Sequence, residues 1–372
     1  MLRVKKIIIS ANTSWYIYNF RQGTIKRLIN EGYIVFSLAS DNIYKRELEE
    51  LGVQHLSFYM DKSSKNPFKD IITFLNYCYL YFKIQPELVL NFTPKVNIYS
   101  TLAGMFFKAK IINNIAGLGS MFVSSGLNAA IAMRLYKITQ SRADHVFFQN
   151  HDDLEFFLKN RIIKENRYSR LPGSGVNINR FNLTEQPADG VTKFILVGRI
   201  IKEKGIENYV AAAKKIKKEN SNVEFDILGF IDEKNPASIS KEQIREWERK
   251  GYINYLGTTD SVNEIVANYS AVVLPSYYRE GVPKSLLEAA SLGKPIITTD
   301  NIGCRETVIP NVTGFLCKPR DSDSLIEELK KFIKLSHSER VEMGVKGREY
   351  IKANFNEDLV IEKYINVING LI

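Results

Sequence analysis

Apolar, β-branched runs alternate with amphipathic segments along the chain. The first series lies at residues 5–10, 33–39, 87–92, 110–115 and 145–150. Strands joined by helical crossovers form parallel sheets, so this order predicts an α/β fold. A second series lies at 193–199, 223–229, 253–257, 271–276 and 295–300. The repetition predicts two doubly wound units, one after the other.

The division between the two units is expected within residues 173–190. This stretch lacks hydrophobic periodicity and is rich in Gly, Asn and Pro, as linkers are. A chain of 372 residues also exceeds the usual size of one hydrophobic core. After the last expected strand, the pattern predicts helices at 323–335, 338–354 and 358–372. The last of these is amphipathic and needs a surface on which to bury its apolar face.

Two helices expected in the first half, at 66–83 and 129–142, combine apolar and basic residues. The first is crowded with Phe, Tyr, Ile and Leu, which either pack on the sheet or lie on a membrane surface. The longest apolar stretch, 71–82, is far shorter than the roughly 20 residues of a transmembrane helix. The apolar run 7–9 is likewise too short for a signal peptide, so a cytoplasmic chain is expected.

The net charge of +10 comes from the first half of the chain. Residues 1–184 hold 24 Lys and Arg against 13 Asp and Glu, and the rest hold 27 against 28. Such an excess favours an anionic partner; nucleic acid, an acidic membrane surface and a phosphorylated lipid all fit. A lysine-rich codon bias would explain the same excess without a partner. The three cysteines lack metal-ligand spacing, which argues against a disulfide framework or a zinc site.

Residues 274–300 predict a ligand-binding turn between a strand and a helix. The strand ends at Pro275, and Pro283 falls in the first turn of the following helix, 283–292, where a missing N–H does no harm. Gly293 then provides the left-handed residue that ends such a helix. Ligands of open α/β sheets bind at the carboxyl ends of the strands, so the start of this helix is expected to face an anion or a polar ligand.

Two carboxylates, Glu280 and Glu288, flank the start of this helix. A carboxylate accepts two hydroxyl hydrogen bonds in a fork, which suits the vicinal hydroxyls of a sugar or a ribose. The backbone amides around 282–285 add donors for a phosphate or for sugar hydroxyls. The alternative is that Glu280 only caps the helix and that Glu288 is a solvated helix residue.

A pair of cations follows the strand expected at 193–199. Arg199 stands at the end of the strand, and Lys204 precedes Gly205 and a helix. A guanidinium and an ammonium at one strand end form a diphosphate clamp, which neutralises a leaving group without a metal. Taken alone, the two residues would also pass for ordinary surface charges.

The spacing of these residues resembles that of the family 4 (group 1) glycosyltransferases, which have the GT-B fold of two Rossmann-like domains facing a central cleft. The E-x7-E pattern of that family corresponds to Glu280 and Glu288, and its G-R-x4-K-G pattern to residues 198–205. Further resemblance lies at 19–36, 117–122 and 175–181. The chain looks most similar to bacterial transferases that extend undecaprenyl-diphosphate-linked sugars in O-antigen, capsule or protein N-glycan assembly.

The resemblance implies a different role for each half of the chain. Residues 1–175, completed by a returning helix at about 357–372, would form the acceptor-binding domain, and 176–356 would form the domain that binds the nucleotide sugar. Some members carry a histidine near the acceptor, but this sequence has Lys95 in the matching region, NFTPKVN. Lys95, together with Asn12, is the acceptor-side candidate.

For the donor, the resemblance implies that Arg199 and Lys204 bind the diphosphate and that Glu288 binds the ribose. The donor sugar would be held by the catalytic residue Glu280 and by Gly281, Val282, Pro283 and Lys284. The reaction would retain the anomeric configuration, with the leaving phosphate assisting attack from the front face. No protein nucleophile, metal or cofactor would be needed beyond the nucleotide sugar.

The donor and acceptor follow from the same resemblance. UDP is the expected carrier and N-acetylgalactosamine the expected sugar, with N-acetylglucosamine, galactose and glucose as alternatives. The acceptor would be a polyprenyl-diphosphate-linked sugar, reached from the cytoplasm at the anionic inner face of the plasma membrane. Nucleic acid is not expected as a partner, because no stacking-aromatic motif or recognition-helix pattern is present.

Two other motifs in the chain are similar to known ligand-binding patterns. The run 321–323, Asp-Ser-Asp, is similar to a metal-binding DxD motif, but it follows the last strand, where Asp323 is expected to cap a helix beginning at Ser324. The glycines at 117–121 lack the third glycine of a dinucleotide loop. Two rival functions share the fold. A UDP-sugar epimerase would need further acid and base carboxylates, and a catalytically silent sugar-nucleotide-binding partner would not need both glutamates and both cations.

Overall fold

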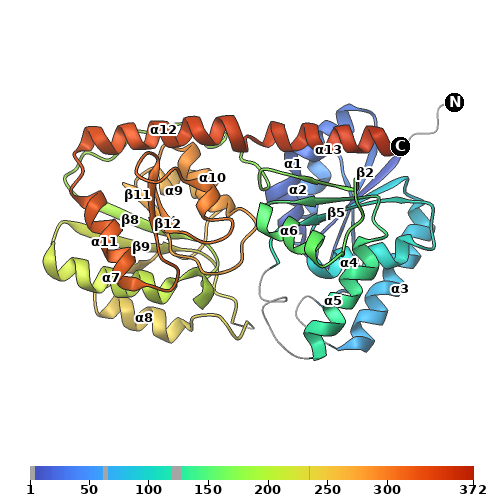
Figure 1. Cartoon of the computed structure of the whole chain (residues 1–372), viewed down its shortest axis with the longest axis horizontal. Coiled ribbons are helices and arrows are strands. Elements are labelled where there is room, and N and C mark those ends of the chain that lie inside the picture. Colours follow the sequence, from blue (N-terminus) through green and yellow to red (C-terminus); the bar gives the residue numbers. More distant parts are fainter. Residues whose placement is uncertain (1–4, 62–65, 119–126, 234) are drawn as a thin grey trace. The chain divides into compact units, whose positions relative to one another are not determined.

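The chain divides into two compact units in the computed structural model, which describes residues 5–61, 66–118, 127–233 and 235–372. Unit 1 comprises Met1–Ser174 and Glu357–Ile372, and unit 2 comprises Gly175–Asn356. Each unit is built around one parallel sheet, of seven strands in unit 1 and six in unit 2 (Figure 1). The predicted α/β fold of two Rossmann-like halves is therefore confirmed.

The sheet of unit 1 has the strand order β3-β2-β1-β4-β5-β6-β7. Its strands are β1 (Lys6–Ser10), β2 (Ile34–Ala39), β3 (Gln54–Ser57), β4 (Leu88–Asn91), β5 (Lys110–Ile115), β6 (His145–Phe148) and β7 (Tyr168–Arg170). Its helices are α1 (Ser14–Asn30), α2 (Lys45–Glu50), α3 (Pro67–Ile84), α4 (Pro94–Gly104), α5 (Leu127–Gln140), α6 (His151–Lys159) and α13 (Glu357–Leu371).

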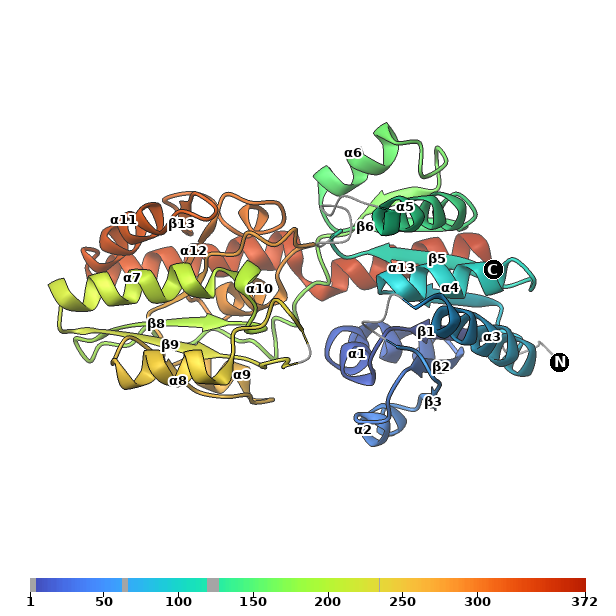
Figure 2. The same ribbon diagram turned by 90° about the horizontal axis from the view of Figure 1, so that it is seen from below.

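The helices of unit 1 cover both faces of its sheet. In Figure 1, α1 and α13 lie above the sheet, and α3, α4 and α5 lie below it. Figure 2, which looks from below, places α3 and α4 in front of the sheet. Two separate apolar clusters result, one under α1 and α13 and the other under α3 to α6.

Helix α13 belongs to unit 1 although it follows unit 2 in the sequence. It packs along α1, where a side chain at Gly23 would come within 2.8 Å of Ile361. Tyr364 is fully buried, and its ring lies 4.9 Å from that of Phe147. The apolar face of this amphipathic helix is thus buried against the sheet of unit 1.

The sheet of unit 2 has the strand order β10-β9-β8-β11-β12-β13. Its strands are β8 (Thr192–Val197), β9 (Val223–Leu228), β10 (Asn254–Tyr255), β11 (Ala271–Leu274), β12 (Ile296–Thr299) and β13 (Gly314–Cys317). Its helices are α7 (Ile206–Glu219), α8 (Lys241–Arg249), α9 (Val262–Val266), α10 (Lys284–Ser291), α11 (Ser322–Ile333) and α12 (His337–Phe355), with short 3-10 turns η1 (Lys202–Lys204) and η2 (Arg305–Thr307).

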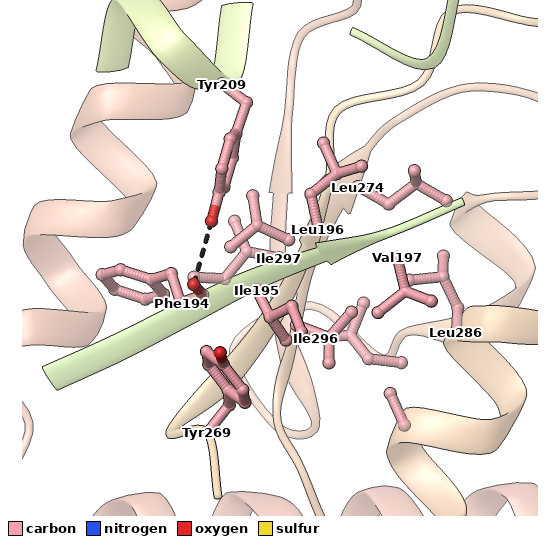
Figure 3. Packing of buried hydrophobic residues seen from close by; sticks show 14 of the residues in the cluster. Phe194, Ile195, Leu196, Val197, Tyr209, Tyr269, Leu274, Leu286, Ile296 and Ile297 are labelled. Carbon is pink, nitrogen blue, oxygen red and sulfur yellow. Dashed lines mark hydrogen bonds between the residues drawn. The ribbon is translucent and has the colours of Figure 1, made fainter. Parts of the chain in front are cut away.

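The core of unit 2 is centred on β8. Figure 3 shows its residues Phe194 to Val197 surrounded by apolar side chains from β11, β12 and α10. Tyr209 of α7 is fully buried and donates its hydroxyl hydrogen to the Phe194 carbonyl at 3.0 Å. The buried Tyr209 hydroxyl thus has a hydrogen-bond partner, as buried polar groups need. The same hydrogen bond holds α7 against β8, the strand that leads into the predicted diphosphate clamp.

Several local predictions needed correction. The sequence pattern missed β3, β7 and β13, which have only three or four residues. Pro283 is the N-cap of α10 rather than a residue of its first turn. The stretch expected as a linker, 173–190, belongs to unit 2 from Gly175 onward, and its Phe181 is buried in the core of that unit. Of the motif at 117–122, residues 119–122 lie outside the described part of the chain.

Candidate functional site

The carboxyl ends of β8 and β11 lie side by side at the topological switch point of unit 2. The chain adds β9 and β10 on one side of β8, and β11 begins the other side. Ligands of doubly wound sheets bind at such a point because neighbouring loops diverge there. The predicted cations follow β8 and the predicted carboxylates follow β11. The two sequence motifs therefore reach the same edge of one sheet.

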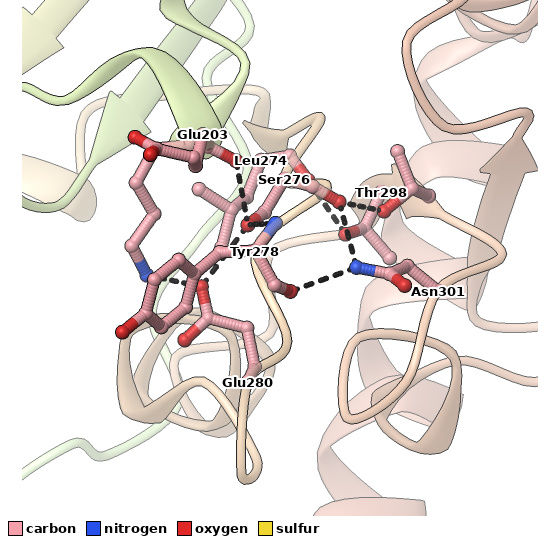
Figure 4. Close-up of polar contacts among 9 residues, drawn as sticks. Glu203, Leu274, Ser276, Tyr278, Glu280, Thr298 and Asn301 are labelled. Atoms are coloured by element: carbon pink, nitrogen blue, oxygen red, sulfur yellow. Dashed lines mark hydrogen bonds and ion pairs between the residues drawn. The ribbon is translucent and has the colours of Figure 1, made fainter. Parts of the chain in front are cut away.

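Lys204 and Glu280 form an ion pair at this edge. The Lys204 Nζ lies 2.6 Å from the Glu280 Oε1, and each side chain is only 11% exposed. Ser276 donates its hydroxyl hydrogen to the same carboxylate oxygen at 3.0 Å (Figure 4). A cation and a carboxylate that were expected to bind different parts of the donor thus contact each other directly.

Backbone hydrogen bonds hold the Glu280 loop in place. The Glu203 carbonyl of η1 accepts the N–H of Tyr277 at 2.9 Å and that of Tyr278 at 3.0 Å. On the other side, Asn301 donates its side-chain N–H to the Tyr278 carbonyl at 2.8 Å (Figure 4). The sequence motifs did not indicate Glu203 or Asn301, because Glu203 acts through its backbone and Asn301 lies beyond the matched pattern.

Two glycines allow the loops of the site to approach one another. Gly205 has a φ of +77°, and a Cβ there would lie 2.1 Å from the Pro275 carbonyl oxygen. Gly303 has a φ of +80°, and a Cβ there would lie 1.9 Å from the Gly281 carbonyl oxygen. Both the left-handed backbone and the contact require glycine. The glycine that closes the G-R-x4-K-G pattern therefore brings Lys204 to the end of β11.

A buried thiol lies near Glu280 but is unsuited to nucleophilic attack. Cys304 is fully buried. Burial raises the pKa of its thiol to about 12, and the neighbouring Glu280 charge acts in the same direction. The thiolate is the reactive form of cysteine, so this residue stays inert near neutral pH.

The start of α10 and Glu288 form the second part of the site. Gly281, Val282 and the N-cap Pro283 are buried, and no side chain caps the helix. The Lys284 Nζ lies 3.9 Å from a Glu288 carboxylate oxygen, and the Glu288 side chain is 17% exposed. The first turn of the helix therefore lies beside a largely buried carboxylate.

Burial changes the acidity of Glu288. Loss of hydration raises the pKa of its carboxyl above the usual value, while the charges of Lys284 and Arg180 lower it. The alternative of a solvated helix residue is therefore wrong for Glu288. Arg180 lies in the segment 175–181, whose resemblance to the family gave it no role.

Arg199 is more exposed than Lys204. Its guanidinium carbon lies 5.9 Å from the centre of the Tyr278 ring, within the range of a cation–π contact. Arg199 is open to solvent, whereas Lys204 is buried and held by its ion pair with Glu280. The two predicted clamp residues thus contact the Glu280 loop in different ways: Arg199 lies near the Tyr278 ring, and Lys204 forms an ion pair with Glu280.

The acceptor-side candidates lie at the equivalent edge of unit 1. Asn12 follows β1, and Lys95 follows β4, the neighbouring strand across the switch point of that sheet. The Lys95 Nζ lies 2.8 Å from an Asp70 carboxylate oxygen, which ties α4 to α3. Lys95 therefore has a structural contact of its own, and its role toward an acceptor stays a prediction.

The DxD-like run has a structural role, with one correction. Asp321, rather than Asp323, caps the following helix, because its carboxylate accepts the Ser324 N–H at 2.9 Å. Within the described ranges, no three His, Cys, Asp or Glu side chains gather as they would around a metal ion.

Comparisons with known proteins identify unit 2. Residues 181–350 match the family model of glycosyl transferases group 1. This match includes both cations and both carboxylates of the site. Residues 181–350 form a glycosyl transferase group 1 domain. The resemblance inferred from the two motifs is confirmed.

Sequence similarity to curated glycosyltransferases extends beyond that domain. An N,N'-diacetylbacillosaminyl-diphospho-undecaprenol α-1,3-N-acetylgalactosaminyltransferase of Campylobacter jejuni is 26% identical over 96% of both chains. The capsular polysaccharide biosynthesis glycosyltransferase CapM of Staphylococcus aureus is 24% identical over 82% of both chains.

Solved structures share the whole architecture. A Rickettsia africae glycosyltransferase superimposes with a TM-score of 0.78 at 19% identity, covering 99% of each chain. Anabaena HepE in complex with UDP and glucose gives a TM-score of 0.80 at 15% identity, covering 98% of this chain and 99% of that one. At these identities the likeness establishes the GT-B fold.

Proposed function

We propose that this glycosyltransferase moves a sugar from a nucleotide diphosphate to a sugar carried on polyprenyl diphosphate, in the assembly of a surface glycan. The observation that carries the donor half is the convergence of two cations, two carboxylates and a helix start at the switch point of unit 2. The acceptor half is supported by the Campylobacter relative, which matches the chain over nearly its full length.

Each site residue has a role in this proposal. Lys204 and Arg199 bind the diphosphate and offset the charge that develops on it as the leaving group. Glu280 binds the donor sugar hydroxyls together with Gly281, Val282, Pro283 and Lys284. Glu288 accepts hydrogen bonds from the ribose hydroxyls, which leaves the base next to the start of α10.

The proposed reaction retains the anomeric configuration and uses no metal. The bond between the sugar C1 and the diphosphate oxygen breaks, and the acceptor hydroxyl oxygen bonds to C1 on the same face. The hydroxyl proton passes to the departing phosphate oxygen. Glu280 is held by Lys204 and Ser276, which suits a hydrogen-bonding role better than covalent attack on C1.

The donor is proposed to be UDP-N-acetylgalactosamine. The Campylobacter relative is an N-acetylgalactosaminyltransferase, and solved neighbours of the same fold contain UDP. UDP-linked N-acetylglucosamine, galactose and glucose are the donors to compare with it. The proposed place of action is the cytoplasmic face of the plasma membrane, where a polyprenyl-linked acceptor and a soluble donor meet.

Thermal stabilisation by UDP, GDP, ADP, CMP and NAD⁺ in the presence of EDTA tests the donor site. A ligand that binds only the folded protein raises its melting temperature, and UDP is expected to do so selectively. No response to any nucleotide would contradict the proposal and favour a silent binding partner.

Transfer from UDP-N-acetylgalactosamine to an undecaprenyl-diphosphate-linked sugar then tests the reaction. Glu280→Ala is expected to lower turnover at least about tenfold, because the sugar loses the group that orients it. UDP affinity is expected to stay equal or to rise, since Lys204 no longer pairs with a carboxylate. Glu327→Ala, an exposed site on α11, serves as the control. Conversion of the donor without any acceptor would instead indicate an epimerase.

A further inference from the structure

The outward face of α3 is apolar along the whole helix. The exposed side chains on this face are Phe68 (76%), Ile71 (53%), Ile72 (46%), Leu75 (56%), Tyr79 (61%) and Phe82 (71%). These positions recur at intervals of one, three or four residues, so they form one continuous stripe on a helix. Among the described residues of α3, no charged side chain lies between the members of this stripe on the helix surface.

The opposite face of α3 already fills the core. Thr73, Tyr77, Leu80, Tyr81 and Ile84 are buried under the sheet of unit 1. A surface helix normally shows polar residues to solvent, as α8 does, where Ile244 alone is fully buried and charged residues cover the outside. The outer stripe of α3 is therefore not needed for packing within unit 1.

Residues outside the helix widen the stripe into a patch. Phe106 is 75% exposed, and its ring lies 6.1 Å from that of Phe74 on α3. Its neighbour Met105 is 47% exposed. On the other side, Asn76 of α3 donates a hydrogen bond to the Tyr59 carbonyl, and Tyr59 is 49% exposed. The stripe with Tyr59, Met105 and Phe106 is called the α3 patch below.

The chain around the α3 patch is strongly basic. Residues 66–142, which contain α3, α4 and α5, hold eight Lys and Arg against Asp70 and Glu87. Three of these lysines form ion pairs, namely Lys69 with Asp61, Lys95 with Asp70 and Lys110 with Asp144. Lys83 and Lys108 are exposed and form no ion pair with a described residue. Free lysines beside a large apolar surface are the combination that binds an anionic lipid surface.

We propose that the α3 patch docks on an anionic lipid bilayer, with Phe and Leu side chains in the interfacial region and the lysines at the phosphate groups. A second copy of this chain would bring equal positive charge to the contact, which disfavours self-association. None of the described helices is long and apolar enough to cross a membrane. Helix α3 would therefore lie on the bilayer, not span it. This inference stands on the surface alone and is independent of the proposed donor and acceptor.

Flotation of the purified full chain with lipid vesicles tests the docking. Phosphatidylcholine vesicles containing phosphatidylglycerol are expected to carry the protein, and pure phosphatidylcholine vesicles to carry much less. Leu75→Ser/Phe82→Ser is expected to lower the partition coefficient at least about tenfold, because two large apolar side chains no longer enter the lipid. Lys83→Gln/Lys108→Gln is expected to lower it about fivefold for each lysine, on anionic vesicles only.

The matched control is Ile43→Ser, which removes an apolar side chain that is 75% exposed outside the patch. It is expected to bind like the wild type. UDP stabilisation should be the same in all variants, which separates docking from the donor site. Equal binding of the Leu75/Phe82 variant and the wild type would overturn the proposal. A second result would also overturn it: the wild type forms a concentration-dependent dimer and does not bind vesicles, and the Leu75/Phe82 variant no longer dimerises.

Discussion

Lys204 and Glu280 are 76 residues apart in the sequence, yet they share one hydrogen bond at the edge of the second sheet. The two motifs that contain them were recognisable separately, because each has its own spacing. Their contact was not predictable, since it depends on β8 and β11 being neighbours. The pair compensates two largely buried charges in the unliganded protein. If Lys204 binds the donor diphosphate as proposed, the diphosphate must compete with Glu280 for it.

The buried carboxyl group of Glu288 lowers the free energy of unfolding at neutral pH. Burial raises the pKa of its carboxyl, so at neutral pH the folded protein holds an ionised group less favourably than the unfolded chain does. Its contribution to stability falls as pH rises from the unfolded value near 4.5 through the raised folded value. Glu288→Gln is therefore expected to make the unliganded protein more stable at neutral pH, which urea unfolding measures.

The same shift predicts how ligand binding depends on pH. In the proposed ribose site, the ionised Glu288 accepts hydroxyl hydrogen bonds, and protonation removes part of that capacity. Affinity for uridine, which has no titrating phosphate, is expected to fall on acidification at a higher pH than an ordinary glutamate would cause. Calorimetric titration of wild type and Glu288→Gln compares the two profiles. A wild-type profile parallel to that of the variant would remove Glu288 from the ribose site.

At the scale of elements, strands that lie in apolar runs were predictable even when short, since β4, β6, β11 and β12 have only four residues each. The missed strands β3 (QHLS) and β7 (YSR) are mostly polar and show no apolar run. Helix ends depend on single hydrogen bonds, so the cap of α11 was assigned to Asp323 instead of Asp321. The loops of the site are held by backbone groups, which leave little trace in the sequence.

The start of α7 offers an element-scale prediction. Gly205→Ala places a Cβ against the Pro275 carbonyl and forces alanine into a left-handed conformation. Unfolding free energy is expected to fall by roughly 2–4 kcal/mol, and UDP affinity several-fold, because Lys204 moves with the turn. Denaturant unfolding and UDP titration measure the two effects.

Gly190→Ala is the matched control for this variant. Gly190 has a φ of +78°, close to that of Gly205, but a Cβ there would meet nothing within 4 Å. It should lose only about 1 kcal/mol, the cost of the left-handed backbone, and keep its UDP affinity. Equal losses in both variants would show that the close approach to β11 has no consequence.

For the whole molecule, the pattern of strands predicted two units, but the assignment of residues 357–372 to the first came from family resemblance alone. An amphipathic helix at the end of a sequence fits either sheet equally well. Packing decides between the two sheets: the Tyr364 ring makes edge-to-face contacts with Phe92 and Phe147, and its hydroxyl donates a hydrogen bond to the Asn114 side-chain oxygen at 2.5 Å.

Tyr364→Ala is expected to weaken unit 1 selectively. Removing a fully buried aromatic side chain costs about 3–5 kcal/mol. Amide hydrogen exchange should therefore accelerate in β4, β5 and α1 but not in β8 or β11, and UDP should still bind. Tyr364→Phe, which deletes only the hydroxyl, should lose about 1 kcal/mol. Faster exchange in both sheets together would show that the units do not unfold separately.

The route of the chain through its two units also constrains synthesis. The 182 residues of unit 2 separate the two segments of unit 1. At ordinary elongation rates roughly 10–35 s pass on the ribosome before α13 follows Ser174. At the end of that time unit 2 has all of its residues, while Phe92 and Phe147 of the nascent first sheet still lack the contact with Tyr364 of α13. A growing chain thus exposes an aggregation-prone apolar face of its first sheet until the final helix emerges. Chaperones that bind exposed apolar surface are suited to protect this face.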